Sequence, residues 1–438
     1  MRVVGRTAVA IAASLERQLH AGGTAAGAAL PPVRQLAGRL RVSPATVAAA
    51  YKQLRARGLV AGRGRRGTRV VSGPPPPSAT AVPRAAIPLG TMDLASGNPD
   101  PAFLPPLDPA LRMAGSAHVL YGAPGLDRGL ARFAAAEFEA DGIAARAMAV
   151  VSGALDGIER VLREYLRAGD RVAVEDPSFP GILDLISASG WVPAPVAIDD
   201  EGLVPEAAAE ALGRGCRAVI VTPRAQNPTG AALTADRAQL LRRTLHRFPE
   251  VALIENDYVG PVAGARAVTL RGGGEAPWAV IRSTSKFLGP DLRVALLAGD
   301  EVTVARVNGR QALGARWVSH LLQRLALALW SDPSSGRRCA RAADIYTARR
   351  TALRAALSAR GIPSRGQSGF NVWVPVANES QVVRAMGDRG WAVAPGERFR
   401  LRSAPAIRIT TATLDPSDAD RLAGDLADAL RPRPAAPA

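Results

Sequence analysis

Lys286, in the segment TSKFLG, has a side chain whose chemistry the other basic residues lack. The chain contains 55 basic side chains, and only Lys52 and Lys286 are lysines. A lysine amine can lose its proton and attack an aldehyde to form a Schiff base, whereas a guanidinium stays protonated. The alternative is that Lys286 is a chance survivor in an arginine-rich sequence. Its neighbours favour the chemical interpretation.

The residues around Lys286 suit a phosphate group. Ser283, Ser285 and Arg293 flank it in RSTSKFLGPDLR, residues 282–293. Hydroxyl groups donate hydrogen bonds, and a guanidinium supplies a fixed positive charge that matches phosphate oxygens.

A second phosphate-binding feature lies upstream, in VSGALDGIERVL (151–162). The pattern predicts a helix with Ser152, Gly153 and Ala154 at its start. Free backbone N–H groups and the helix dipole favour an anion at that position.

Polar and aromatic residues follow three apolar runs. The runs RVAVEDP (171–177), RAVIVTP (217–223) and VALIEND (251–257) predict strands, and helical patterns separate them. This rhythm predicts a mostly parallel sheet, with functional groups at the carboxyl ends of its strands. The residues that we expect there are Phe179, Asn227, Asn256, Asp257 and Tyr258.

Proline marks the main domain boundary. The segment GPPPPSATAVPRAAIP (73–88) has many prolines, which remove backbone donors and favour extended conformations. We predict a small basic domain over 1–72, a linker over 73–91 and an α/β domain over 92–433. Within the last, we expect a large part over about 120–310 and a smaller α+β subdomain over about 320–433.

The basic charge is concentrated at the N-terminus. The net charge is +17, and residues 1–75 hold 13 basic residues against one acid, Glu16. Such a concentration indicates a polyanionic partner for this domain. The alternative is a solvated basic helical domain with no such partner.

Local signals within this domain predict a helix-turn-helix. VRQLAGRL (33–40) is a short amphipathic helix, and Ser43 and Pro44 suit the N-terminus of a second helix that ends near Gly58. LVAGRGRRGTRVV (59–71) then predicts a β-hairpin wing.

These segments resemble the winged-helix domain of GntR-type regulators. The resemblance implies double-stranded operator DNA as the partner. Pro44 stands where many relatives have an arginine that reaches DNA, so we expect phosphate contacts to carry more of the affinity here. The residues to which the resemblance assigns DNA contacts are Arg34, Ser43, Ala45, Thr46, Arg63, Arg65 and Arg66.

The motifs of the larger domain, in this order, resemble fold-type I aminotransferases, which bind pyridoxal 5′-phosphate (PLP) on such a lysine. Together with the winged helix and the proline-rich linker, they resemble the MocR subfamily of GntR regulators. TPRAQNPTG (222–230) and RWVSHLLQ (316–323) are most similar to members that control vitamin B6 metabolism.

The resemblance implies a role for each matched residue. Lys286 would bind PLP covalently as a Schiff base, with Phe179 stacked on the ring and Asn227 and Tyr258 at its hydroxyl. Phe179 could instead be an ordinary core aromatic. The residues implied around the phosphate are Ser152, Gly153, Ala154, Ser283, Ser285 and Arg293, with Asn256 and Asp257 near the ring nitrogen.

Two further residues extend these implied roles. Tyr121, in LYGAPGLDRGL, matches a tyrosine that reaches the phosphate across a dimer interface, which implies an obligate homodimer. Arg408, in AIRITTATL, matches an arginine that grips an amino-acid carboxylate. Arg408 could instead be the salt-bridge partner of a strand end.

Asn256 departs from the family pattern. The family places an aspartate there, under the pyridine nitrogen, and its charge makes PLP an electron sink. An amide can hydrogen-bond to the ring but cannot balance its positive charge. We therefore expect a PLP-sensing transcriptional regulator of pyridoxal kinase or PLP-synthesis genes, with residual transaminase activity at most.

Three alternatives remain. The chain could be a true aminotransferase that carries a DNA-binding domain, or a regulator that senses an amino compound such as GABA or taurine through bound PLP. The large domain could also be only a dimerisation scaffold. Low cysteine content (Cys216, Cys339) and the absence of a long apolar run favour a cytoplasmic protein with no disulfide framework, no membrane segment and no metal site.

Overall fold

The computed structural model describes eight segments of the chain and divides them into two domains. Arg63, Arg65 and Arg66 of the expected wing, together with most of the expected linker, lie outside the described residues. The described residues are 3–20, 28–56, 60–62, 67–70, 87, 90–115, 118–272 and 276–431.

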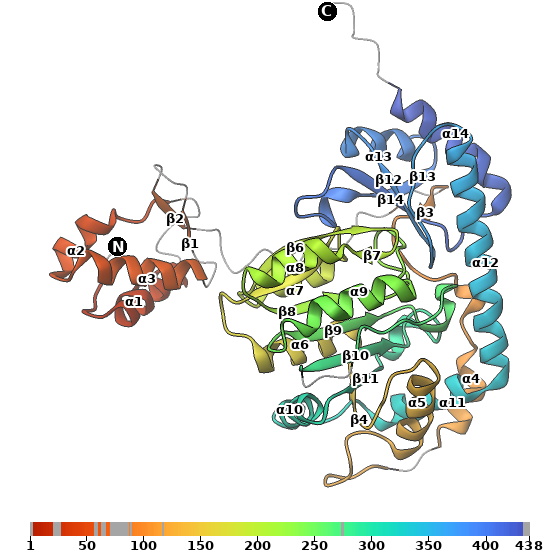
Figure 1. Ribbon diagram of the computed structural model, residues 1–438, viewed down its shortest axis with the longest axis horizontal. Helices are drawn as coiled ribbons and strands as arrows, with labels where there is room; N and C mark the ends of the chain where they lie inside the picture. Colours follow the sequence, from red (N-terminus) through yellow and green to blue (C-terminus); the bar gives the residue numbers. More distant parts are fainter. Residues whose placement is uncertain are drawn as a thin grey trace, which may run out of the picture. The chain divides into compact units, whose positions relative to one another are not determined.

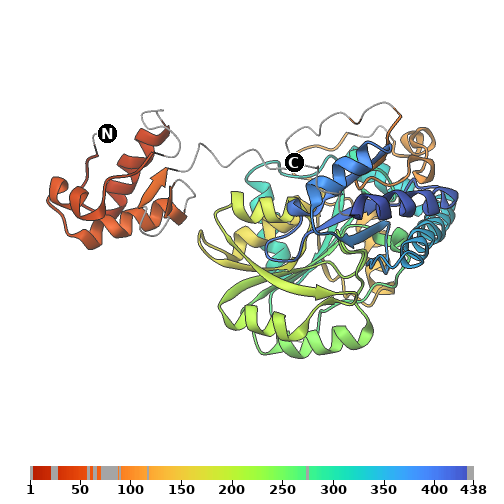
Figure 2. The ribbon, with the colours of Figure 1, turned by 90° about the horizontal axis from the view of Figure 1, so that it is seen from above.

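The N-terminal domain is a winged helix-turn-helix, as predicted. Its helices pack together beside the short strands (Figure 2). They enclose a small apolar core that includes Leu36, Val47 and Leu54. Two short antiparallel strands follow the third helix and form the base of the wing. The elements are α1 (Ala8–His20), α2 (Val33–Leu40), α3 (Pro44–Ala56), β1 (Val60–Gly62) and β2 (Thr68–Val70).

Local hydrogen bonds explain the turn between α2 and α3. Arg41 ends α2 in the left-handed conformation, with φ 53°. Ser43 then caps α3, because its Oγ accepts from the backbone N–H of Thr46 at 3.1 Å. The Tyr51 hydroxyl donates to the carbonyl of Pro31 at 2.7 Å and fastens α3 to the start of α2.

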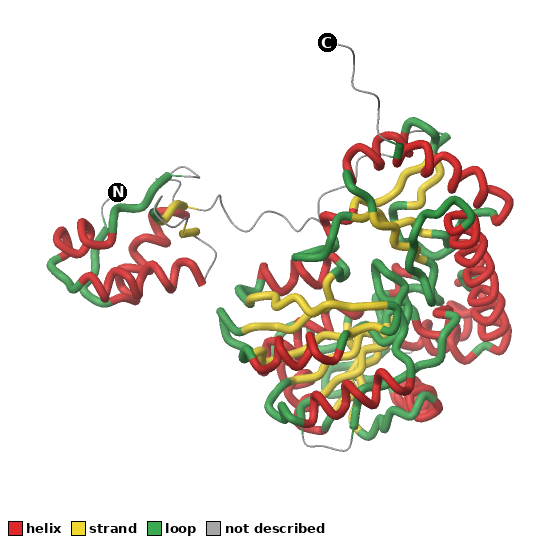
Figure 3. Tube along the Cα trace, turned by 45° about the horizontal axis from the view of Figure 1, so that its top comes forward, coloured by secondary structure: helices red, strands yellow, loops and turns green. Residues whose placement is uncertain are grey.

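The large domain is built on an eight-stranded, mostly parallel sheet (Figure 3). The strand order is β4-β11-β10-β9-β8-β5-β6-β7, and β11 runs antiparallel to β10 and β4. The expected strands at 171–177, 217–223 and 251–257 are present, with bounds within two residues of those predicted. The strands are β4 (Ala147–Val151), β5 (Arg171–Asp176), β6 (Val192–Asp199), β7 (Gly202–Leu203), β8 (Cys216–Val221), β9 (Ala252–Asp257), β10 (Trp278–Ser283) and β11 (Ala295–Gly299).

Helices cover both faces of this sheet (Figure 1). Gly157 of α6 approaches Ile281 and Val151 so closely that an added Cβ would lie 3.0–3.1 Å from their side chains. On the opposite face, the Phe138 ring of α5 lies 4.7 Å from the Arg282 guanidinium. The helices are α4 (Leu107–Met113), α5 (Arg128–Ala140), α6 (Ala154–Tyr165), α7 (Pro180–Ala188), α8 (Pro205–Gly213), α9 (Ala235–His246), α10 (Glu301–Ala312), α11 (His320–Ser331) and α12 (Pro333–Ser358). None of the described helices is long and apolar enough to cross a bilayer.

A four-stranded sheet with the order β12-β14-β13-β3 forms the C-terminal subdomain. Two helices cover it, and the long helix α12 runs beside it (Figure 1). Its edge strand, β3, comes from the start of the large domain and pairs in parallel with β13. The elements are β3 (Met92–Leu94), β12 (Asn371–Pro375), α13 (Glu379–Gly387), β13 (Trp391–Pro395), β14 (Ala406–Thr410) and α14 (Ala419–Leu430).

A buried carboxyl group on β9 has an unusual environment. Glu255 is 1% exposed, and burial raises its pKa to about 7. Its Oε1 accepts from the Thr269 hydroxyl at 2.9 Å and from the Leu270 N–H at 2.6 Å. Because the folded protein holds this proton more tightly than the unfolded chain, Glu255 lowers stability progressively as the pH rises from 4.5 to 7.

The substitution Glu255→Gln is expected to stabilise the protein at pH 8, because the isosteric amide carries no charge to bury. The gain should be on the order of 2 kcal/mol above pH 7 and should shrink toward zero as the pH falls to 4.5. Melting temperatures of both proteins between pH 4.5 and 8 measure this difference. A stability gain that does not change with pH would show that the pKa of Glu255 is not raised in the folded protein.

Candidate functional site

Three strand ends bring the predicted site residues to one face of the large sheet. In the β-ladder Asn256 is opposite Ile281, Ser283 is opposite Ala295, and Ala295 is opposite Val151. Partners in register share a face, and Gly157 of α6 contacts Ile281 and Val151. Asn256 and Ser283 therefore face α6, whose N-terminus directly follows β4.

The start of α6 is shaped around an arginine. Gly153 is the N-cap, with φ 101°, and an added Cβ would lie 2.3 Å from Arg293 Nη2. The same nitrogen donates to the carbonyl of Ser152 at 2.8 Å. The guanidinium thus lies directly against a helix N-terminus, and both features attract an anion.

Two serine hydroxyls lie at the end of β10. Ser283 donates to the Ser285 Oγ at 3.0 Å, and Ser283 is buried. The ladder connects Ser283 through Ala295 to Val151, the residue before Ser152. Because neighbouring strands are about 4.8 Å apart, the β10 end is about 10 Å from the β4 end, a span that a phosphate and its ligands can bridge.

Phe179 approaches the first turn of α6. An added Cβ on Gly181 would lie 2.6 Å from the Phe179 ring and 3.0 Å from Leu155. Phe179 is only partly buried. A partly exposed ring beside an anion site can stack on a planar ligand.

Lys286 follows β10 and lies against a backbone carbonyl. Its Nζ donates to Gly97 O at 2.7 Å, across 189 residues of sequence. Gly97 has φ 69°, and an added Cβ would lie 3.2 Å from both Nη atoms of Arg408. The Lys286 amine and the Arg408 guanidinium therefore both lie next to Gly97.

Arg408, on β14, is 2% exposed. Its Nη1 donates to Asn227 Oδ1 at 3.1 Å, and its Nη2 donates to the carbonyl of Ala95. The guanidinium also lies 4.8 Å from the Phe399 ring centroid. These polar and aromatic contacts hold the Arg408 guanidinium beside Asn227, Ala95 and Phe399.

Tyr258 contacts the loop that follows β8 and that carries Asn227. The Tyr258 hydroxyl donates to Ala225 O at 2.7 Å, and burial raises the pKa of Tyr258 above its ordinary value. Tyr258 therefore stays a hydrogen-bond donor at neutral pH.

A buried chain of hydrogen bonds holds this loop in place. Glu175 accepts from the Thr222 N–H at 2.8 Å and from Gln226 Nε2 at 3.1 Å, and Gln226 Oε1 accepts from Thr229. All four side chains are buried. Because Asn227 lies between Gln226 and Thr229, this chain fixes the position of Asn227.

Asn256 supplies the test of whether the site fits PLP. Its Oδ1 is buried, and no donor in the described part of the chain reaches it. A buried amide oxygen without a donor is costly and indicates a ligand that donates to it. A ring N–H facing α6 would meet that need, although the neutral amide adds no negative charge to hold that proton on the ring.

The residues present therefore fit PLP. Lys286 would bind its aldehyde carbon, Asn256 would contact the ring nitrogen, Phe179 would stack on the ring, and the α6 N-terminus with Arg293 would hold the phosphate. When bound, PLP supplies an aldehyde for an amine and a ring that withdraws electrons from the attached carbon.

Two predicted site residues lie apart from this group. Asp257 faces the opposite side of the sheet, where its oxygens accept from Arg224 at 2.8–2.9 Å and from Arg282 at 2.8 Å. These guanidinium groups hold the pKa of Asp257 well below its ordinary value, although burial opposes them. Tyr121 is 81% exposed and packs against Trp317, with ring centroids 5.6 Å apart.

Known protein families match both domains. A model of bacterial regulatory proteins of the gntR family matches residues 7–70, and a model of aminotransferase class I and II matches residues 112–426. The vitamin B6 salvage pathway transcriptional repressor PtsJ of Salmonella typhimurium is 41% identical over 429 residues, which are 97% of this chain and 99% of PtsJ. The chain belongs to the MocR group of GntR-type regulators.

Other relatives share smaller parts of the chain or only its fold. The HTH-type transcriptional regulator TauR of Rhodobacter capsulatus is 27% identical over 262 residues, which are 57% of this chain and 52% of TauR. The multiple substrate aminotransferase of Thermococcus profundus aligns with a TM-score of 0.70 at 18% identity, over 78% of this chain and 92% of the enzyme. This structural similarity shows the aminotransferase fold.

The predicted DNA-contacting residues of this MocR regulator lie at the starts of α2 and α3. Arg34, Ser43 and Ala45 are exposed, and Thr46 is partly exposed. Thr46 is tied to Ser43, because their hydroxyl oxygens are 2.8 Å apart. This arrangement leaves the N-terminal turn of the second helix open, the part of a helix-turn-helix that reads a DNA groove.

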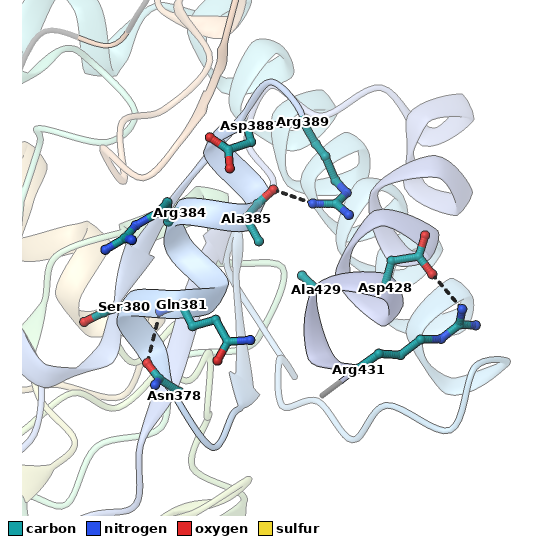
Figure 4. Close-up of a pocket in the computed structure, with 10 residues that line it drawn as sticks. All are labelled: Asn378, Ser380, Gln381, Arg384, Ala385, Asp388, Arg389, Asp428, Ala429 and Arg431. Atoms are coloured by element: carbon teal, nitrogen blue, oxygen red, sulfur yellow. Dashed lines mark hydrogen bonds and ion pairs between the residues drawn. The ribbon is translucent and has the colours of Figure 1, made fainter. Parts of the chain in front are cut away.

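A separate pocket of about 300 Å³ lies between α13 and α14 (Figure 4). Its lining is polar, and Arg431 Nη1 lies 3.3 Å from Asp428 Oδ1 within it. It contains none of the residues predicted for the PLP site.

Sequence reasoning missed the segment Ala95–Gly97. The signal was a glycine in the run ASGNPD (95–100), which by itself predicts only a turn. It also missed Phe399 and the buried Glu175–Gln226 pair, because nothing local in their sequence indicates what they contact.

The substitution Gly153→Ala is expected to weaken PLP binding about tenfold or more. The new methyl group would push the Arg293 guanidinium away from the α6 N-terminus and would also strain a backbone with positive φ. Gly169→Ala is the matched control, since Gly169 has φ 91° and no atom within 4 Å of its added Cβ. Absorbance titration with PLP measures both affinities, and equal losses in the two variants would overturn the prediction.

Proposed function

We propose that this MocR regulator binds PLP at Lys286 and represses vitamin B6 salvage genes in response to it. The observation that carries the proposal is the set of groups at the carboxyl ends of β9 and β10. These are the Asn256 oxygen that lacks a donor, Lys286 beside Gly97, and Arg293 at the α6 N-terminus. The similarity to PtsJ, which extends over both domains, supports repression of B6 salvage as the output.

The N-terminal domain would bind operator DNA through exposed residues of α2 and α3 and through the wing arginines Arg63, Arg65 and Arg66. With 13 basic residues and one acid in the first 75 positions, its affinity should depend strongly on salt. Operator binding of this kind would take place in the cytoplasm, where the chromosome lies.

A homodimer fits the exposed apolar residues of the large domain. Leu111 and Met113 of α4 are 55% and 70% exposed, and Tyr121 is more exposed still. A second copy would cover such side chains, and Tyr121 would reach the partner's phosphate site. A dimer would also present two winged helices to a two-fold symmetric operator.

Asn256 supports a sensor over an efficient aminotransferase. Catalysis requires a negative group at the ring nitrogen to hold the pyridinium charge, and an amide carries none. Glu255 and Asp257 flank Asn256 in the sequence. Both alternate with Asn256 along β9 and so face the other side of the sheet, where two arginines hold Asp257.

Fluorescence anisotropy on the gene's own upstream DNA, with and without PLP, tests the proposed function. In the wild type, PLP should change the DNA affinity by about tenfold. Lys286→Arg should abolish the response, because the guanidinium keeps the positive charge but cannot condense with an aldehyde. An equal response of the two proteins to PLP would show that Lys286 is not the sensor.

The substitution Asn256→Asp is expected to raise the rate of amino-group transfer from a panel of L-amino acids by at least about tenfold, which corresponds to about 1.4 kcal/mol of barrier. The carboxylate would supply the missing negative charge at the ring nitrogen. Asn256→Ala is the control, since it removes the amide without adding charge. Stopped-flow absorbance measures the rates. Rapid amino-group transfer by the wild type would refute the proposal that the protein is a sensor rather than an aminotransferase.

A further inference from the structure

One short segment lies between the two cationic side chains of the PLP site. Residues Ala95–Gly97, which we call the strip, accept from both: Gly97 O from Lys286 Nζ at 2.7 Å, and Ala95 O from Arg408 Nη2. In this structure the backbone carbonyl groups of the strip therefore accept hydrogen bonds from side chains that could also bind a ligand.

Gly97 fits this position only as glycine. Its φ of 69° lies in the left-handed region, and an added Cβ would meet the Arg408 guanidinium at 3.2 Å. A carboxylate that binds Arg408 therefore has to share the guanidinium with the strip or displace it.

The amine of Lys286 faces a similar competition. To attack the PLP aldehyde, Nζ must lose a proton and form a new bond to carbon, with release of water. After this step the Lys286 nitrogen carries fewer N–H groups than the free ammonium group, so it donates less readily to Gly97 O. PLP and the strip therefore compete for the same nitrogen.

Side chains distant in sequence fasten the strip at its C-terminal side. There the Asp100 N–H donates to the Tyr346 hydroxyl at 2.9 Å, and Arg349 pairs with Asp100 at 2.8 Å. At the other side, Asp93 Oδ1 accepts from the N–H groups of Ala95 and Ser96, at 2.9 Å each.

The N-terminal side of the strip continues directly into β3, Met92–Leu94. This strand has three residues, and it pairs with β13 at the edge of the four-stranded sheet. In the sequence, the proline-rich segment that leads to the winged helix immediately precedes it. A displaced strip would therefore pull on the part of the chain that connects to the DNA-binding domain.

We propose that the strip couples PLP binding to DNA binding: PLP at Lys286 releases Gly97, the strip shifts, and β3 transmits the shift to the linker. This inference rests on the proposed PLP-responsive function. It supplies the differential contact that any ligand needs in order to shift a conformational equilibrium, because Lys286–Gly97 forms in only one of the two states.

Hydrogen exchange in the full-length wild type tests the first step without any substitution. After PLP loading, confirmed by borohydride reduction and mass spectrometry, peptides over 91–97 should exchange faster, since the Ala95 and Ser96 amides lose their fixed turn. A peptide over 371–375, within β12, serves as the reference. Unchanged or slower exchange at full loading would overturn the proposal.

The substitution Gly97→Ala tests the coupling itself. The methyl group should force the strip away from Arg408 whether or not PLP is bound, so DNA affinity at verified PLP loading should differ by less than about twofold from the affinity without PLP. Gly361→Ala is the control, because Gly361 has φ 70° and no atom within 4 Å of its added Cβ. It should keep the wild-type response to PLP.

A second variant tests the coupling independently in case Gly97→Ala does not fold. Asp93→Ala removes the acceptor that shapes the strip and leaves the Lys286 and Arg408 side chains in place. It should reduce the PLP response of DNA binding at least threefold relative to the wild type. A full response in either variant would refute the coupling, whereas a wild type that ignores PLP would refute the proposed function instead.

Discussion

Two buried guanidinium groups, Arg224 and Arg282, require negative charge, which the buried Asp257 supplies together with the partly exposed Asp141. The side chains of Arg224, Arg282 and Asp257 are 7% exposed or less, and each arginine donates to the Asp257 carboxylate. Removing one partner of such a buried pair typically costs about 3–5 kcal/mol, because a charge would remain buried without compensation. This cluster ties β9, β10 and the β8 loop together on the face that α5 covers.

The position of Asn256 follows from this constraint. Successive residues of a strand point to opposite faces, so Asp257 in the ion cluster places Asn256 on the α6 side. There it shares a face with Ser283 and lies beside the helix N-terminus that Gly153 and Arg293 shape. The chain therefore has a carboxylate next to the PLP site in sequence but an amide within it. The carboxylate that catalysis would need therefore lies one residue away from the position that faces the PLP site.

The same site joins parts of the chain that are far apart in sequence. Lys286 follows β10, Arg408 lies on β14, and both contact residues just after β3. A ligand held there would touch the large sheet, the C-terminal subdomain and the start of the large domain at once. This arrangement suits a regulator, since occupancy can change how these parts are held together without completing a reaction.

The sequence by itself determined much of this protein. Charge at the N-terminus, the helix-turn-helix signals and the proline-rich segment predicted the domain order. The apolar runs predicted three strands to within two residues, because burial on both faces of a parallel sheet leaves a local pattern. Lys286 stood out because an amine has chemistry that a guanidinium lacks.

Only the tertiary structure decided which of the candidate residues meet. It placed Asp257 and Asn256 on opposite faces, and it brought Ala95 and Gly97 between Lys286 and Arg408. It also showed that Arg408 is buried beside Phe399, whereas Tyr121 is exposed. Contacts between residues hundreds of positions apart leave no periodic signal in a single sequence, since they depend on how β-strands pair and helices pack.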